Sequence, residues 1–457
     1  MPIPLIPSST TAAWTGDRFF VYMVTLVAAT AGFLFGFDIA VINGALMLMR
    51  DQFRLTEIQT ELAASSLLAG CIVGATFAGP LSDRYGRRRI LMVAALLFAA
   101  SSLGSALPRN LTEFVIARLL GGFAIGAASL LAPLYIAEVA PPQIRGRLVT
   151  MNQFAIGSGV LMAYFTNWLL SFQGPGSWRL MFAVAAIPSL ALVAGLFFVP
   201  ESPRWLVERG LHPAAHAILA RVAGAETARA ELAAIRESVA EESGTLSELW
   251  QPGVRTAVLI AVALAVLQQF SGMNTVLFYG SIIFREQMGH TSDTDAIGLN
   301  VVIGLTMLVT TAAALWIIDR VGRRLLLMLS AAGMVIAQVA LAAAFLLKPP
   351  PGGFIIGVIL FCAGSYTLGL APVTWVVLSE IFPTRIRGRA MSVATVSLWM
   401  ACTILTFTFL SLVSALTISG AFLIYSAMCA LEIILVWRAV PETSGKTLEE
   451  IARFWKR

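Results

Sequence analysis

Two residues of opposite charge, Asp38 and Arg118, each lie inside a long apolar stretch of the chain. An ionisable side chain in hydrocarbon costs several kcal/mol unless it is paired, so these two residues are natural partners for each other. Asp38 keeps its charge when it is paired, and it is expected to take up a proton when it is separated from Arg118 in an apolar site. The pattern predicts a proton-carrying carboxyl group whose protonation depends on conformation. The alternative is a permanent ion pair that holds two helices together.

A second group of polar residues suits a solute that is rich in hydroxyl groups. Amides donate and accept hydrogen bonds as hydroxyls do, and an aromatic ring offers an apolar face to C–H groups. The candidate substrate-binding residues are Gln268, Gln269, Asn274, Tyr279 and Trp375. Gln268 and Asn274 are not three or four residues apart, and Gly272 is expected to break the helix between them. The alternative for adjacent buried glutamines is hydrogen bonding between helices.

Charged motifs occur twice along the chain and in the same order. Each copy contains Asp-Arg-x-Gly-Arg-Arg, then a glutamate seven residues before Arg-Gly-Arg, then Pro-Glu-Ser or Pro-Glu-Thr. The copies begin at Asp83, Glu138 and Pro200, and at Asp319, Glu380 and Pro441. Only 12% of the residues are charged, so this repetition indicates two homologous membrane halves.

The repeated charges predict a gate at the ends of the spans. Carboxylate–guanidinium pairs are directional, and we expect them to join the helix ends of the two halves and to break whenever a cavity between the halves opens on that side. The predicted gate residues are Asp83, Arg84, Arg87, Glu138, Arg145, Glu201, Asp319, Arg320, Arg323, Glu380, Arg387 and Glu442. Leu315 stands where the first copy has Gly79, so the second latch is expected to pack less closely. The alternative is that these charges only fix the topology.

The composition indicates an all-α membrane protein. The chain is 58% hydrophobic with a mean hydropathy of +0.83, whereas a soluble protein carries roughly twice its charged fraction. Apolar stretches of about 20 residues can cross a bilayer, and they must be helices because strands with open edges cannot satisfy their backbone groups in lipid. Twelve such transmembrane helices are predicted, at 20–48, 62–82, 90–107, 112–137, 148–171, 179–199, 256–284, 296–318, 325–347, 354–379, 390–414 and 419–440.

The distribution of basic residues predicts the topology. Most of them fall in alternate loops, which places both termini and the central loop in the cytoplasm and argues against nucleic acid as the reason for the high pI. The first fifteen residues lack the features of a cleaved signal peptide. The expected order is a cytoplasmic N-terminus (1–18), a six-helix bundle (19–200), a cytoplasmic linker with short amphipathic helices (201–254), a second bundle (255–440) and a cytoplasmic tail (441–457).

The sequence offers no pattern typical of an enzyme or a metal site. The histidines fall in predicted loops, no serine elbow is evident, and the cysteines lie singly inside predicted spans. We therefore expect neither catalysis nor a cofactor or bound metal. Because both halves are in one chain, a monomer is expected.

The motifs resemble those of a known transporter family. The segment at 83–88 resembles the loop between the second and third helices of the major facilitator superfamily. Segments 200–206, 268–274, 380–383 and 441–443 resemble motifs of its sugar porter family, and the resemblance extends from about residue 32 to 450. It implies two six-helix bundles related by pseudo-symmetry around a central cavity, with alternating access by rocking of one half on the other.

The resemblance also implies residue roles. In the sugar porter family, residues that match Gln268, Gln269, Asn274 and Trp375 contact the sugar. Bacterial proton-linked members carry an aspartate and a fourth-helix arginine that match Asp38 and Arg118. The resemblance therefore implies transport of a monosaccharide, a hexose or pentose, with protons across the inner membrane, and the proton gradient is the energy source.

Three positions depart from the family pattern. Val160, Met307 and Leu398 stand where the better-known hexose and pentose transporters often have amides, and each lost hydrogen bond costs about 0.5–1.5 kcal/mol. Asn167, about two turns past Val160, either compensates in part or lies at an interface between helices. The alternative function is transport of a less polar solute such as a cyclitol, an organic acid or a drug-like compound. A membrane sensor that does not transport is disfavoured.

Overall fold

The computed structural model describes residues 16–241, 246–251, 254–287, 292–347, 351–382 and 386–443. The first half of the chain crosses the bundle six times. Five crossings are the helices α1 (Arg18–Phe53), α2 (Glu57–Tyr85), α3 (Arg87–Ala106), α4 (Leu111–Val139) and α5 (Arg145–Ser171). The sixth crossing follows a 3₁₀ turn, η1 (Pro175–Ser177), and consists of α6 (Trp178–Ala183) and α7 (Ala186–Phe198). We call this six-helix bundle the N half.

The second half of the chain makes six more crossings, and we call it the C half. Its first crossing is α11 (Val254–Gln269) with α12 (Met273–Gln287), followed by α13 (Asp293–Val321) and α14 (Arg323–Ala344). The next is α15 (Gly352–Ser365), the π-helical η3 (Tyr366–Leu370) and α16 (Ala371–Glu380). The last two crossings are joined in α17 (Arg387–Ala439), which reverses at Thr417, where φ is 70° and ψ is 162°.

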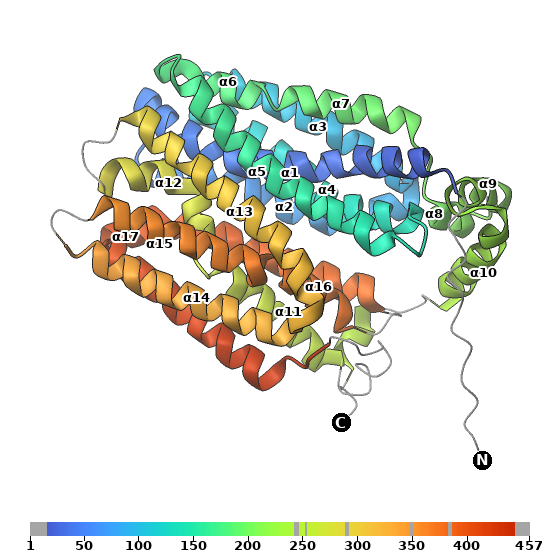
Figure 1. Cartoon of the computed structure of the whole chain (residues 1–457). Coiled ribbons are helices and arrows are strands. Elements are labelled where there is room, and N and C mark those ends of the chain that lie inside the picture. The colour runs from blue at the N-terminus through green and yellow to red at the C-terminus, as the bar shows by residue number, and fades with distance from the viewer. Residues whose placement is uncertain are drawn as a thin grey trace.

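The expected all-helical membrane fold with two six-helix bundles is confirmed. Eleven stretches of the described residues are long and apolar enough to cross a bilayer, and the last of them is α17, which contains two of the expected spans. Figure 1 shows the N half and the C half as two layers of helices that lie side by side.

The segment between the halves forms short helices at one end of the bundles. They are α8 (Pro203–Glu208), α9 (His212–Ala223) and α10 (Ala225–Glu241), and a 3₁₀ turn, η2 (Leu246–Trp250), precedes α11. We call the end of the molecule that carries α8–α10, at the right of Figure 1, the linker end and the opposite end the distal end. The short amphipathic helices expected in this segment are thus present, and they lie against the N half.

Specific contacts fix the linker helices to the ends of α1 and α2. Asp17 caps the N-terminus of α1 by accepting from the amide of Phe20 at 3.0 Å, and Arg221 of α9 lies 3.4 Å from the same carboxylate. Trp205 of α8 donates to the backbone carbonyl of Asp83 at 2.9 Å, and Arg209 donates to the same oxygen at 3.1 Å. These bonds satisfy free carbonyls at the end of α2 and tie the linker to the N half.

Candidate functional site

Asp38 of α1 and Arg118 of α4 form the predicted ion pair inside the N half. Arg118 Nη1 donates to Asp38 Oδ1 at 2.5 Å, and Nη2 donates to the backbone oxygen of Asp38 at 3.1 Å. Arg118 is fully buried and Asp38 is 4% exposed. Desolvation of two charges is offset only where the geometry is good and further hydrogen bonds are made, as in this two-point contact.

The pair leaves part of its bonding capacity unused. Among the described residues, Asp38 Oδ2 has no hydrogen-bond partner, and the same holds for Arg118 Nε. The guanidinium carbon of Arg118 lies 5.2 Å from the centre of the Phe182 ring on α6. A Cβ atom at Gly121 would lie 2.3 Å from Ser101 Oγ and 3.5 Å from Asp38 Oδ2, so the backbone of α4 approaches closely here. One carboxylate oxygen is therefore held by Arg118, and the other makes no hydrogen bond to the described residues.

The predicted amides form a hydrogen-bonded chain in the C half. Asn274 Nδ2 donates to Gln269 Oε1, Gln269 Nε2 donates to Gln268 Oε1 at 2.8 Å, and Gln268 Nε2 donates to the carbonyl of Leu370 in η3 at 3.1 Å. All three amides are at least nine-tenths buried. The chain therefore links the α11–α12 crossing to the π-helical segment that precedes α16.

Gly272 breaks the helix between Gln269 and Asn274, as expected. α11 ends at Gln269 and α12 begins at Met273, and Gly272 has φ +80°. A Cβ atom there would lie 2.6 Å from the ring of Tyr425, so both the backbone conformation and the space require glycine. Without this break, Gln269 and Asn274 would not face each other.

The two aromatic candidates lie differently from the amides. The Tyr279 hydroxyl donates to the backbone oxygen of Thr406 on α17 at 2.6 Å, and its ring centre lies 5.1 Å from that of Phe409. Its polar group is thus engaged within the C half. Trp375 is half-buried on α16, the helix that η3 leads into. Trp375 therefore stays a prediction for sugar stacking, while Tyr279 supports the packing of α12 on α17 in this state.

Asn43 of α1 joins the halves in a way that the sequence analysis missed. Its Nδ2 donates to the backbone oxygens of Val276 and Leu277 at 3.0 and 2.9 Å and to Asn300 Oδ1 at 3.2 Å. Its Oδ1 accepts from the amide and the hydroxyl of Ser281 at 2.9 and 2.6 Å. Asn43 is fully buried, so one side chain of the N half satisfies several polar groups of α12 and α13.

Other bonds between the halves lie at the distal end. Arg50 and Asp51 of α1 pair with Glu286 and Arg285 of α12 at 2.7 and 2.6 Å. Glu61 of α2, which is 1% exposed, accepts from both the amide and the hydroxyl of Ser411 on α17 at 2.7 Å. With the bonds of Asn43, these contacts form what we call the distal seal.

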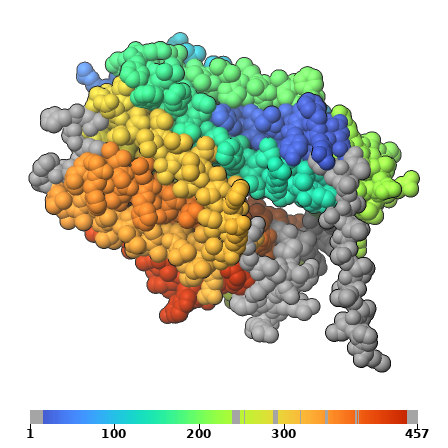
Figure 2. Space-filling view, viewed as in Figure 1, coloured from blue at the N-terminus to red at the C-terminus, as the bar shows by residue number. Residues whose placement is uncertain are grey.

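The surface of the molecule agrees with this pattern. Figure 2 shows the halves in contact toward the distal end and a recess between them toward the linker end, beside α13. The two ion pairs between the halves that the structure describes both lie at the distal end. The structure is therefore sealed on one side and hollowed on the other.

In this state, with a recess at the linker end, the described gate charges pair within each half. The expectation that they join the halves concerns the state that is closed at this end, and it stays a prediction. Arg87 lies 3.2 Å from Glu138 and 2.9 Å from Asp83, all in the N half. Arg323 lies 3.5 Å from Glu380, both in the C half. The physical reason is proximity: each arginine begins the helix that follows its own motif, and the glutamate ends a neighbouring helix of the same bundle.

Glu201 and Glu442 cap helices. Glu201 Oε1 accepts from the amide of Arg88 at 3.0 Å, and Glu442 accepts from the amides of Arg323 and Arg324, each at 3.0 Å. A carboxylate at a helix N-terminus satisfies free amides and complements the helix dipole. Gly86 and Gly322 precede these helices with φ +100° and +88°, and a Cβ atom at either would lie within 3 Å of the capping carboxylate.

The remaining predicted gate residues differ among themselves. Arg84 lies over the Tyr85 ring at 5.2 Å. Arg145 donates to the carbonyl of Ala140 at 3.3 Å and lies 3.7 Å from Glu231 of α10, which ties the linker to α5. Arg320 is exposed. The side chains of Asp319 and Arg387 lie outside the described residues.

The three apolar departures are buried in the structure. Val160, Met307 and Leu398 are 6%, 8% and 3% exposed. Asn167 does not replace them in a cavity, because its Nδ2 donates to the carbonyl of Val41 on α1 at 2.9 Å. Of the two expectations for Asn167, the helix interface is the one that the structure contains.

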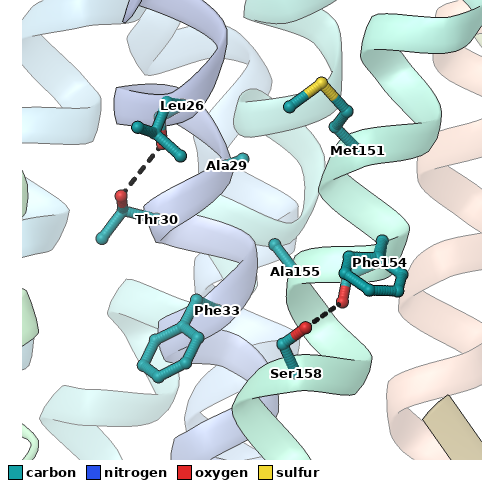
Figure 3. A pocket seen from close by; sticks show the side chains of 8 residues that line it. All are labelled: Leu26, Ala29, Thr30, Phe33, Met151, Phe154, Ala155 and Ser158. Atoms are coloured by element: carbon teal, nitrogen blue, oxygen red, sulfur yellow. Dashed lines mark hydrogen bonds between the residues drawn. The ribbon is translucent and has the colours of Figure 1, made fainter.

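An apolar pocket of about 290 Å³ lies between α1 and α5 (Figure 3). Its two hydroxyl groups are engaged by their own helices: Thr30 donates to Leu26 O at 3.0 Å and Ser158 donates to Phe154 O at 2.9 Å. None of the predicted site residues lines it. The lining side chains therefore offer no free donor and few polar atoms for a sugar, and we do not assign the solute to this pocket.

Comparison with known proteins places this geometry in a family. The model of the family described as "Sugar (and other) transporter" matches residues 24–455. The chain belongs to this family. This sugar transporter is 37% identical to the D-xylose-proton symporter of Escherichia coli, with 96% of each chain covered. It is 36% identical to the arabinose-proton symporter of Bacillus subtilis, with 95% of each chain covered.

A solved structure shows the same fold. The xylose transporter of E. coli in a partially occluded inward open conformation superposes with a TM-score of 0.85 at 34% identity, and the match covers 94% of this sugar transporter and all of that chain. The resemblance stated from the motifs is thus confirmed at the level of the family and of the major facilitator fold.

Proposed function

We propose that the protein carries a monosaccharide, a hexose or pentose, together with protons across the bacterial inner membrane by alternating access. The observation that carries the proposal is the buried Asp38–Arg118 pair, in which one carboxylate oxygen has no partner among the described residues. Ionisable residues inside a membrane are functional candidates, and buried carboxyl groups there commonly belong to proton pathways. The names of the relatives, symporters of arabinose and xylose, agree with this choice.

The mechanism follows from what each group does. A proton on Asp38 removes the charge that holds Arg118, so the contact between α1 and α4 weakens and the helices can rearrange. α1 also carries Asn43, Arg50 and Asp51 of the distal seal. Protonation of Asp38 and release of the seal are thereby linked through one helix. The rearrangement exposes the binding region to one side of the membrane at a time.

The sugar-binding groups are the amide chain at the α11–α12 break and the Trp375 ring. In the present state the amides bond to one another, and a sugar would replace these bonds with hydroxyl contacts of the same kind. The hydroxyl groups of a bound sugar therefore offset the free energy that is needed to separate the amides. An apolar solute that separates the amides leaves them without hydrogen-bond partners.

The state described corresponds to an inward-facing transporter. The positive-inside rule places the linker end and both termini in the cytoplasm, so the recess opens inward and the seal lies outside. Both halves that enclose the site belong to one chain, and the functional unit is a monomer in the lipid bilayer. The energy source is the proton gradient.

A second candidate function is transport of a less polar solute, such as a cyclitol. It is favoured by the apolar side chains of Val160, Met307 and Leu398, which stand where hydrogen-bonding residues were expected. The choice between the two depends on whether the solute's hydroxyls find enough partners at the amide chain.

Uptake into proteoliposomes tests the proposal. Labelled D-xylose, L-arabinose, D-galactose, D-glucose and myo-inositol are offered with and without an inward proton gradient. We expect gradient-driven accumulation of a monosaccharide by the wild type. Asp38→Asn should abolish this accumulation while counterflow of the same sugar survives. Accumulation that is unchanged by Asp38→Asn would refute the assignment of the proton to Asp38, and transport of myo-inositol alone would favour the second candidate.

A further inference from the structure

The last crossing contains a buried acid that the proposed mechanism does not use. Glu432 of α17 is fully buried, and neither of its carboxylate oxygens has a hydrogen-bond partner among the described residues. It lies seven residues before the end of α17 at Ala439, about 10 Å from the linker end of the helix. A carboxylate in this position would be an isolated charge in a dry interior, which costs far more than a neutral acid group.

In the part of the chain that the structure describes, no cation is paired with Glu432. The described titratable groups within electrostatic reach are Cys429 on the same helix and Tyr366 on η3, and Cys362 lies near Cys429. Five helices pack against α17. Their cations lie at helix ends: Arg255 of α11 and Arg323 and Arg324 of α14 within the first two residues, Arg84 within the last turn of α2, and Arg285 within the last turn of α12. The other charged residues of these helices are acids: Glu57, Glu61 and Asp83 of α2, Glu286 of α12 and Glu380 of α16. Nothing described here neutralises a negative charge at this position.

The neighbours of Glu432 connect it to the proposed sugar site. Cys429, one turn earlier on α17, lies 3.9 Å from the carbonyl of Ser271, the residue next to Gly272 in the α11–α12 break. Gln338 of α14 donates to the same carbonyl. Ser271 Oγ and Gln338 Oε1 are also buried without a partner among the described residues. Several unsatisfied polar atoms therefore gather behind the break that presents Gln269 and Asn274.

The buried acid of the N half, unlike Glu432, is paired with a cation. Arg118 neutralises Asp38, whereas Glu432 has no such partner in the described part of the C half. Counting from the repeated Pro-Glu motifs at Pro200 and Pro441, the position in the N half that matches Glu432 is Ala191, so the acid is not part of the internal repeat.

We propose that Glu432 is a second proton-binding site, in the C half, that holds a proton while the distal end is sealed and exchanges it when the α11–α12 break and η3 move. In the sealed state the neutral acid avoids an unpaired charge. Movement of the break brings the hydroxyl of Ser271, the amide of Gln338 or water to the carboxyl, and the proton can then leave to solvent as the carboxylate gains donors. The use of this exchange in transport rests on the proposed function; the proton site itself does not.

Infrared spectroscopy of the purified full-length protein tests the site without any transport. The wild type at neutral pH should show a C=O stretching band of a protonated carboxylic acid that decreases as the pH is raised. The band should be absent in Glu432→Gln and retained in Asp38→Asn. Glutamine has nearly the shape of the neutral acid, so this variant is expected to fold. As a second readout that needs no substitution, labelling of glutamate with carbon-13 should shift the same band.

The outcomes separate the alternatives. A band that is retained in Glu432→Gln, or that does not shift with labelled glutamate, would mean that Glu432 does not hold a proton and would overturn the proposal. A band that is lost in Glu432→Gln but is constant up to strongly alkaline pH would mean a permanently neutral acid, which would also overturn it. Loss of sugar uptake in the wild type would instead count against the proposed function and leave the infrared result standing.

Discussion

Removal of the Asn43 side chain should open the distal seal. In Asn43→Ala, the carbonyls of Val276 and Leu277 lose a donor, and the amide and hydroxyl of Ser281 lose an acceptor. These bonds exist only while the halves are in contact, and in the open state water can replace them. The substitution therefore raises the free energy of the sealed state relative to the open state.

The magnitude follows from the number of bonds. Each net hydrogen bond contributes about 0.5–1.5 kcal/mol, and Asn43 makes five bonds to the C half. Even at the lower limit, their loss costs about 2.5 kcal/mol, which corresponds to a shift of about 70-fold in the ratio of open to sealed molecules. Asn167→Ala is the matched control, because Asn167 is equally buried but its amide bonds to Val41 within the N half.

Spin labels at the distal end measure the ratio of open to sealed molecules. Leu107 and Leu416 are exposed, lie at the distal ends of the two halves and can be replaced by cysteine, while the four native cysteines are buried. Double electron–electron resonance should show a larger share of long distances in Asn43→Ala than in the parent. Identical distance distributions for Asn43→Ala and Asn167→Ala would refute the reasoning that Asn43 belongs to the seal.

Three further results are expected. Gly272→Ala should lower the free energy of unfolding by at least about 1–2 kcal/mol and weaken solute binding, because φ is positive at Gly272. Calorimetry measures the effect, with Gly353→Ala as the control, and equal stability of the two variants would contradict the reasoning. Glu201→Ala should lower the free energy of unfolding by about 0.5–2 kcal/mol through the lost helix cap, and an unchanged thermal midpoint would contradict this. High salt should raise the ratio of open to sealed molecules by less than about thirtyfold, since the two partly exposed pairs, Arg50–Glu286 and Arg285–Asp51, contribute about 0–1 kcal/mol each. A larger increase in the long spin-label distances would mean that the seal is mainly ionic.

The sequence alone was sufficient to predict functional residues whose type is unusual inside a membrane span. Asp38 and Arg118 were paired correctly because each charge needs a partner and the spans offered few others. Gly272 was also predicted, because the spacing of the amides required a break. The twelve crossings followed from length and hydropathy alone, and the break expected between the spans 390–414 and 419–440 falls at Thr417, where the backbone is not helical.

The sequence did not predict contacts in which the partner is a backbone group, or contacts for which several neighbouring side chains could serve as the partner. Asn43 was not predicted because its partners are largely backbone carbonyls and amides of α12. Every residue carries such groups, so the sequence does not indicate which of them a side chain contacts. The gate charges were assigned across the halves, but repetition of a motif does not say whether Arg87 meets Glu138 of its own half or an acid of the other. Glu432 could have been found by the argument that identified Asp38.

The most direct test of the central claim is a measurement of proton movement driven by sugar. Proteoliposomes without an imposed pH gradient, with a pH-sensitive dye inside and potassium with valinomycin to clamp the voltage, receive the transported sugar on the outside. The account predicts acidification of the interior on addition of the sugar by the wild type and none by Asp38→Asn. Sugar entry without acidification in the wild type would contradict the account, because solute and proton would then not be carried together.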